Sequence, residues 1–219
     1  MKNIFIIAVM LLASAAIPLR AQEWKLAKDA KGIQVYTRSV PGSDFKAVRA
    51  EMKIKTSIPS LIALMTDFDS FPKWYPRMKN FTCVKEINKL EYYIHIVIDA
   101  PWPAKDRDSI SHFKIRQNPA DKVVTIEFTD VPGIMKEEPG MVRVKNLYGI
   151  FRFAPEEDGM VKVTYETHSD PGGKLPAWMS NATTTDRPYR IFRNMREMVI
   201  REEYQNRICE IYAEIQAAN

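Results

Sequence analysis

The last quarter of the chain constrains the fold more than any other stretch. Residues 189–219 contain neither Pro nor Gly, and apolar side chains recur among them at steps of three and four. This spacing predicts an amphipathic α-helix that would reach roughly 45 Å if it ran uninterrupted. A helix with one apolar stripe has to bury that stripe against another layer. The stripe consists of Phe192, Met195, Val199, Ile200, Tyr204, Ile208, Ile211 and Ile215.

The stretches upstream are typical of strands joined by short turns. Apolar and polar residues alternate in most of them, and Pro, Gly, Asn and Asp mark the connections. A helical region is expected after the second strand, beginning at the N-cap Ser57. Because consecutive strands with short connections pair antiparallel, we predict an α+β domain whose curved antiparallel β-sheet wraps around a long C-terminal α-helix. The expected strands are residues 32–38, 45–55, 81–87, 91–99, 107–116, 123–128, 141–153 and 161–169.

The N-terminal segment is not expected to belong to this domain. A basic residue precedes an apolar run at residues 4–12, and small residues follow at 13–16. This order is that of a secretory signal peptide, and the apolar run is too short to span a bilayer. We expect cleavage after Ala21, or else after Ala16. Residues 1–21 would then be the signal peptide, and residues 22–219 one secreted or periplasmic domain.

Composition narrows the choice of partners. Hydrophobic residues make up 46% of the chain, so disorder is not expected. Removing Lys2 and Arg20 with the signal peptide lowers the formal net charge from +5 to +3, which gives little reason to expect a nucleic-acid partner. Cys83 and Cys209 would enter an oxidising compartment, either as buried thiols or as a disulfide.

The sequence carries no catalytic or metal-binding pattern. Its three histidines, His95, His112 and His168, show no paired spacing, and no glycine-rich phosphate loop or nucleophile elbow is present. Neighbouring side chains in His168-Ser169-Asp170 would point to opposite faces of a strand, so they are not expected to form a triad. We therefore predict no enzymatic activity, no metal and no cofactor.

Three stretches carry a family resemblance. They are Asp69–Pro76 with its Phe-Pro and Trp-Tyr-Pro, Pro101–Asp108 with Pro-Trp-Pro followed by Arg-Asp, and Asp170–Asn181 at the start of the C-terminal helical region. In these motifs and in the order of its elements, the chain resembles the START (StAR-related lipid transfer) domain family over residues 23–217. The resemblance implies the helix-grip fold.

The resemblance also implies a tunnel between the sheet and the C-terminal helix that holds one lipid or sterol-like molecule. The loop at Thr129–Gly140 would then act as a lid, and Arg107 of the Arg-Asp signature would reach into the tunnel. Strand alternation independently places Arg107 on the same face as Phe113 and Ile115. A buried guanidinium needs an anion, which either the ligand or a carboxylate of the protein would supply.

The other site candidates are aromatic or apolar. Trp74, Trp102 and Trp178 are expected as core or tunnel-wall packing. Ile134 and Met135 at the lid tip would plug the tunnel mouth or dip into a bilayer, and the first is favoured because such loops usually pack on their own domain. The predicted ligand-binding residues are Arg107, Trp74, Ile96, Trp102, Phe113, Ile134, Met135, Tyr165, Trp178 and Phe192.

A basic stripe runs along the C-terminal helical region. It suits either contact with anionic lipid head groups or a solvated face with acidic partners, and the second interpretation is favoured because such stripes are usually solvated. Its members are Arg187, Arg190, Arg193, Arg196 and Arg201.

These observations predict a monomer that binds and transports a single lipid or other hydrophobic ligand without catalysis, with transient contact at a membrane surface. Two other classes stay open. One is a helix-grip enzyme, such as a cyclase or hydrolase acting on a hydrophobic substrate, which needs titratable groups clustered in the tunnel. The other is a protein-interaction module whose core is filled by its own side chains.

Overall fold

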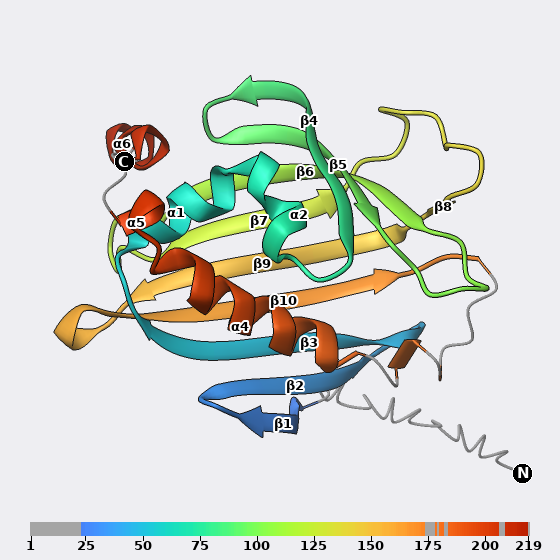
Figure 1. Ribbon diagram of the computed structural model, residues 1–219, viewed down its shortest axis with the longest axis horizontal. Coiled ribbons are helices and arrows are strands. Elements are labelled where there is room, and N and C mark those ends of the chain that lie inside the picture. The colour runs from blue at the N-terminus through green and yellow to red at the C-terminus, as the bar shows by residue number, and fades with distance from the viewer. Residues whose placement is uncertain (1–22, 174–177, 179, 182–183, 206–208, 219) are drawn as a thin grey trace, which may run out of the picture.

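The computed structural model describes residues 23–173, 178, 180–181, 184–205 and 209–218. One strongly curved sheet carries helices on its concave face (Figure 1). Its strands are β1 (Lys25–Ala30), β2 (Ile33–Val40), β3 (Ser43–Lys55), β4 (Met78–Asn88), β5 (Glu91–Ile98), β6 (Arg107–Gln117), β7 (Val124–Asp130), β8 (Val142–Arg143), β9 (Lys145–Pro155) and β10 (Met160–Asp170). Neighbours follow the order β1-β2-β3-β10-β9-β7-β6-β5-β4, all antiparallel, and the short β8 pairs parallel to β6.

Helices follow β3 and close the chain. The side chain of Ser57 accepts a hydrogen bond from the backbone N–H of Ser60 at 3.1 Å, which confirms the predicted N-cap. The helical elements are α1 (Ile58–Thr66), η1 (Phe68–Ser70), α2 (Phe71–Trp74), η2 (Glu157–Gly159), α4 (Asp186–Val199), α5 (Glu202–Gln205) and α6 (Glu210–Ala217). Together with the sheet they confirm the predicted α+β helix-grip architecture.

The C-terminal helical region differs from the prediction in its continuity. α4 ends at Val199, α5 and α6 follow as separate helices, and residues 206–208 lie outside the described part. Ile200 is 60% exposed although it belongs to the predicted stripe. α6 returns to the sheet instead, where Ile215 is buried and Gln216 Nε2 donates to Gln117 Oε1 at 2.8 Å. The prediction of one unbroken helix is therefore wrong, because bending back keeps Ile215 out of water.

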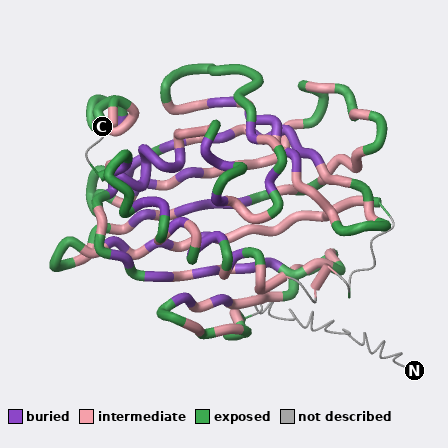
Figure 2. The backbone as a smooth tube through the Cα atoms, viewed as in Figure 1, coloured by how far each residue is buried: buried purple, intermediate pink, exposed green. Residues whose placement is uncertain are grey.

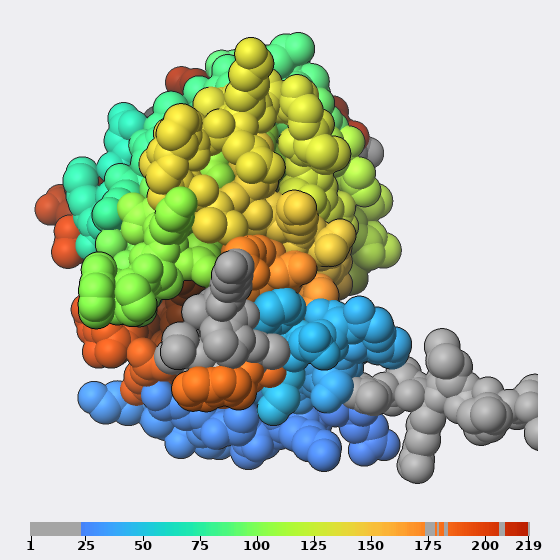
Figure 3. All heavy atoms as spheres, turned by 90° about the vertical axis from the view of Figure 1, so that its right-hand side faces the viewer, coloured from blue at the N-terminus to red at the C-terminus, as the bar shows by residue number. Residues whose placement is uncertain are grey.

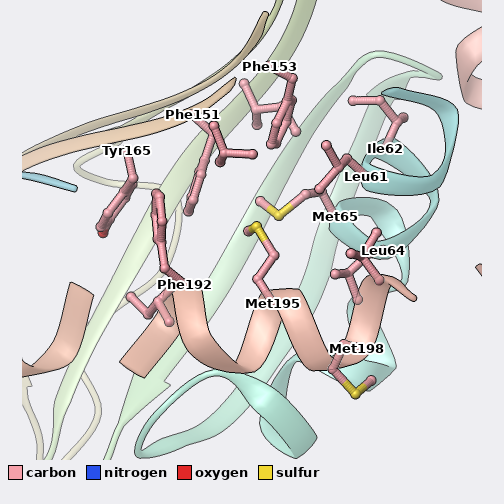
Figure 4. Close-up of a cluster of buried hydrophobic side chains, with 14 of the residues drawn as sticks. Leu61, Ile62, Leu64, Met65, Phe151, Phe153, Tyr165, Phe192, Met195 and Met198 are labelled. Carbon is pink, nitrogen blue, oxygen red and sulfur yellow. The ribbon is translucent and has the colours of Figure 1, made fainter. Parts of the chain in front are cut away.

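Side chains from α1 and α4 meet those of β9 and β10 in one apolar cluster (Figure 4). Leu61, Phe153, Phe192 and Met195 are each 0% exposed. Phe192 and Met195 belong to the predicted stripe of the helix, so its inward face is confirmed for α4. Burial is uneven along the sheet: toward the end that α4 does not cover, β7 and β10 are half-buried and β9 is mostly exposed, whereas β6 stays buried over residues 108–111 (Figure 2).

The two edges of the sheet are irregular. β1 shifts its register against β2 between Leu26 and Lys28. β4 shifts its register against β5 at three places and is exposed along most of its length. Lys79 and Lys85 lie on this outer strand. Such bulges and charges are typical of protected sheet edges.

Two other predictions concern the N-terminus and the cysteines. The predicted signal peptide, residues 1–21, lies outside the described residues. In the described part, no helix is long and apolar enough to cross a membrane. Cys83 on β4 and Cys209 ahead of α6 are not joined by a disulfide there.

Candidate ligand-binding site

The concave face of the sheet has a closed half under α1 and α4. Tyr165 and Phe151 stack there with ring centroids 4.4 Å apart, and Figure 4 shows both rings on the side facing Phe192. Burial raises the pKa of the Tyr165 phenol well above its ordinary value, so this group stays neutral. The closed half is formed by Ile115, Val124, Ile126, Phe151, Phe153, Val163 and Tyr165, all of which are buried. It is an apolar surface suited to hydrocarbon.

The other end of the same face is the open half, and it is polar. Strand alternation brings Arg107, Ser109 and Ser111 of β6 to the concave side, and Asp130 of β7 lies opposite Ser111 in register. Ser111 is 0% exposed, whereas Arg107 and Asp130 are half-buried. The open half consists of Ile96, Ile98, Arg107, Ser109, Ser111 and Asp130. Polarity therefore rises toward this end of the sheet, while exposure rises at its rim, at Arg107 and Asp130, and not at the two serines.

Arg107 bridges backbone groups at the rim of the open half. Its Nε donates to the carbonyl oxygen of Pro171 at 3.4 Å, and its Nη1 donates to that of Lys105. Burial lowers the pKa of the Arg107 guanidinium, and the negative charge of Asp106 partly offsets this by raising it. Among the described residues, Arg107 forms no ion pair with a carboxylate of the protein. Its predicted role in selecting a head group stays a prediction.

A buried ionic network occupies the convex side of the same strand, and the sequence did not indicate it. Asp108 is 1% exposed and accepts two hydrogen bonds from Arg143, at 3.0 Å from Nε and 2.8 Å from Nη2. His95 Nε2 lies 3.3 Å from the same carboxylate. The Asp108 carboxylate raises the pKa of the Arg143 guanidinium. Bidentate pairing of this kind satisfies both charges and fixes their geometry.

Arg143 also holds the loop predicted as a lid, which runs over residues 131–141. Its guanidinium donates to the carbonyl oxygens of Met135 and Lys136 at 3.3 Å and 3.2 Å. The backbone N–H of Val142 donates to the carbonyl oxygen of Asp106, just before β6, at 2.9 Å, and that of Val144 donates to the carbonyl oxygen of Asp108 of β6 at 2.8 Å. The base of the loop is therefore part of the sheet. Asp108 belongs to the Arg-Asp signature, but no local pattern marks Arg143 as its partner.

The predicted site residues fall into three groups. Trp74, Phe113, Tyr165 and Phe192 are buried, and Ile96 and Met135 are half-buried. The remaining apolar residues do not line an interior. Packing of the tryptophans in the core or in a tunnel wall is wrong for two of them, because Trp102 and Trp178 are 92% and 71% exposed, and Ile134 at the loop tip is 41% exposed.

A glycine on β9 lets the two halves of the concave face meet. Phe128 of β7 lies flat over Gly149, where an added Cβ would come within 2.0 Å of its ring. The Phe128 ring is also stacked beside that of Tyr165, with centroids 6.2 Å apart. A glycine inside a strand is the sequence signal for such a close approach.

The histidines lie away from this surface. His95, His112 and His168 alternate with inward residues of β5, β6 and β10, so all three belong to the convex side. His168 Nε2 lies 3.1 Å from Ser43 Oγ, and His112 Nε2 lies 3.3 Å from a Glu91 oxygen. Among the described residues, no group of three His, Cys, Asp or Glu side chains could hold a metal ion.

A sheet gripping one amphipathic helix, with one apolar and one polar half on its concave face, defines a helix-grip domain. The family model for the START domain matches residues 8–202, and the chain belongs to the START domain family. An uncharacterized protein of Pseudomonas aeruginosa is 33% identical over 176 residues, which cover 80% of this chain and 86% of that protein.

Solved structures give the same result. The STAR-related lipid transfer protein of Xanthomonas axonopodis is 31% identical, with a TM-score of 0.75 over 81% of this chain and 99% of that chain. Human STARD10 is similar in fold, with a TM-score of 0.76 over 89% of this chain and 80% of that chain, at 16% identity.

Proposed function

We propose that this START domain binds one lipid or other hydrophobic ligand between its sheet and α4, and carries it without altering it chemically. The observation that supports this proposal most directly is the division of the concave face. An acyl chain or ring system would lie in the closed half, and the polar end of the ligand in the open half. Affinity would come mainly from apolar area, at roughly 25 cal/mol per Å² removed from water.

Methionine side chains would make room for the guest. Met65 and Met195 meet between α1 and α4, and Met198 lies one turn further along α4 (Figure 4). Met52 on β3 and Met78 on β4 are buried too. Methionine is unbranched and adapts its shape to its surroundings, so these residues can repack around a ligand at small cost. The interior would thus be a tunnel when loaded.

A non-catalytic role fits the placement of acid–base groups. Ser109 and Ser111 are hydroxyls on the concave face, and a serine nucleophile needs a base within hydrogen-bond reach. All three histidines lie on the convex side, away from those hydroxyls. The histidines therefore do not supply the titratable cluster that the enzyme interpretation requires.

The exposed end of the domain would touch membranes transiently during ligand exchange. The loops at 99–106 and 131–141 project from the end of the open half (Figure 3). Trp102 and Ile134 on these loops are exposed, and Lys105 and Lys136 beside them are exposed cations. Aromatic and basic side chains together favour an interface with anionic lipid. We further propose that residues 1–21 direct export and that the mature protein acts as a periplasmic monomer.

Native mass spectrometry tests the binding proposal. Protein purified from its bacterial host should carry a lipid mass that is lost on denaturation. Ile96→Trp, at the half-buried wall of the open half, should abolish this mass, because the larger ring fills the route inward. Val84→Trp on the exposed edge strand is the matched control and should retain it. A folded wild-type protein that carries and takes up no lipid would contradict the proposal.

A further inference from the structure

Two buried polar atoms stand out in the interior. The indole Nε1 of Trp74 and the hydroxyl Oγ of Ser111 are inaccessible, and neither has a hydrogen-bond partner among the described residues. The two residues are 3% and 0% exposed. Buried polar groups in folded proteins are almost always paired, because an unpaired one loses its bonds to water without compensation. Two such atoms in the interior of one domain require an explanation.

A row of packed aromatic rings leads from Trp74 toward the strand that carries Ser111. Trp74 on α2 packs on Phe71, whose ring stacks on Phe81 with centroids 3.9 Å apart. The ring centroids of Phe81 and Phe113 are 6.3 Å apart, edge to face. Phe113 lies two residues from Ser111 on the same face of β6. Trp74 and Ser111 are therefore linked through one set of packed aromatic rings.

The chemistry of these groups specifies what would satisfy them. An indole N–H can only donate, and a serine hydroxyl can donate to the same acceptor. Tyr75 and Tyr165 add a third donor nearby, since their hydroxyl oxygens are 3.5 Å apart and one of the pair can turn to a ligand. The cation of the region, Arg107, stays at the rim and bonds to backbone carbonyls. A buried ionised carboxylate would lack a counterion at this depth, whereas a neutral carbonyl would not need one.

Building on the proposed lipid-binding function, we infer that Trp74 and Ser111 form a recognition site for a neutral acceptor oxygen of the ligand. An ester or acyl carbonyl is uncharged and has two lone pairs that can accept from donors of this kind. The ligand class is thus an acyl ester lipid rather than a bare hydrocarbon. Trp74 and Ser111 determine this specificity, while the closed half binds the chain that both kinds of ligand share.

Two probes of matched length, methyl palmitate and octadecane, test the inference by displacement of a fluorescent apolar dye from delipidated protein. The wild type should bind the ester about tenfold more tightly, the usual loss when one buried partner is left unpaired. Ser111→Ala and Trp74→Phe should each bring the two affinities close together, because each weakens binding of the ester more than binding of octadecane. Ser60→Ala is the matched control, because Ser60 is an equally buried serine bonded to Ser57.

Two readouts separate recognition from a structural role. Ser111→Ala should not lower the stability of the empty protein, since it removes an unpaired group, whereas Ser60→Ala should lower it. In the wild type, the ¹H–¹⁵N indole resonance of Trp74 should move on adding methyl palmitate and not on adding octadecane. Both readouts remain informative if Trp74→Phe does not fold, because neither of them uses that variant. Equal affinities for both probes, with a static Trp74 resonance, would overturn the inference alone. Binding of neither probe would overturn the proposed function with it.

Discussion

The two faces of β6 differ in how their polar groups are satisfied. On the convex face, Asp108 is paired with Arg143 and His95 although it is almost completely buried. On the concave face, Ser111 is equally buried and unpaired among the described residues, and Arg107 bonds only to backbone. The same strand thus supports a closed ionic network on one side and open bonding capacity on the other. The convex face stabilises the fold, and the concave face is suited to a guest.

Breaking the convex pair should have the largest effect. Asp108→Ala leaves the Arg143 guanidinium without its carboxylate, with a side chain only 13% exposed. We expect the free energy of unfolding to fall by about 3 to 5 kcal/mol, measured by urea titration. Arg152→Ala breaks a pair with Glu166 in which the Arg152 side chain is 40% exposed, and it should cost about 0 to 1 kcal/mol. If Asp108→Ala lowers the free energy of unfolding only slightly, the convex face does not stabilise the fold more than the concave face does.

A second substitution tests whether another buried, hydrogen-bonded polar pair contributes to stability as the pair on the convex face does. Tyr204 is 2% exposed, and its hydroxyl donates to Asp67 Oδ2 at 2.8 Å. Tyr204→Phe should lower the free energy of unfolding by about 2 kcal/mol, because a bond to a charged acceptor is lost. Tyr148→Phe, at a tyrosine that is 44% exposed, is the control and should have almost no effect.

The same pair predicts a dependence on alkaline pH. Burial, together with the Asp67 carboxylate, raises the pKa of the Tyr204 phenol from its ordinary value of 10 to about 12. Above pH 10 the unfolded chain loses this proton before the folded protein does, so stability should fall as the pH rises from 10 to 12. Tyr204→Phe should lose less stability over that interval than the wild type. Parallel pH profiles for the two proteins would contradict the expectation.

Truncation on the concave face should have the smallest effect on stability. Arg107→Ala removes bonds to two backbone carbonyls from a half-buried position, at a cost of about 1 kcal/mol. Its main consequence should be a weaker preference for lipids with anionic head groups, measured with wild-type protein as reference. Arg116→Ala, on the exposed convex side of the same strand, should leave that preference unchanged. Unchanged lipid binding and head-group preference in Arg107→Ala would rule out the selector role.

Local patterns were enough to predict most of the strands and their faces, but neither β1 nor the division of residues 141–153 into β8 and β9 was predicted. Alternation in β6 and β10 depends only on the pleat, so the inward positions of Phe113 and Tyr165 were correct. The break after Val199 was not predictable, because it depends on where the sheet ends and not on the spacing of apolar residues. Trp102 was expected inside from its size, but a residue in a loop between strands need not pack. Asp108 and Arg143 are 35 residues apart in the sequence, so no local repeat or spacing indicates that they pair.

The irregular edge strands, β1 and β4, affect how two copies of the chain could associate. A flat sheet edge offers unpaired backbone groups to any second edge, which is how such domains join into ribbons. The register of β4 shifts three times and that of β1 once, so neither edge offers a regular row of backbone donors and acceptors to a second copy of the chain. The lysines on β4 add mutual repulsion between like edges. Self-association through the rims of the sheet is thereby discouraged, which is consistent with the proposed contact of the loop-bearing end with a lipid surface.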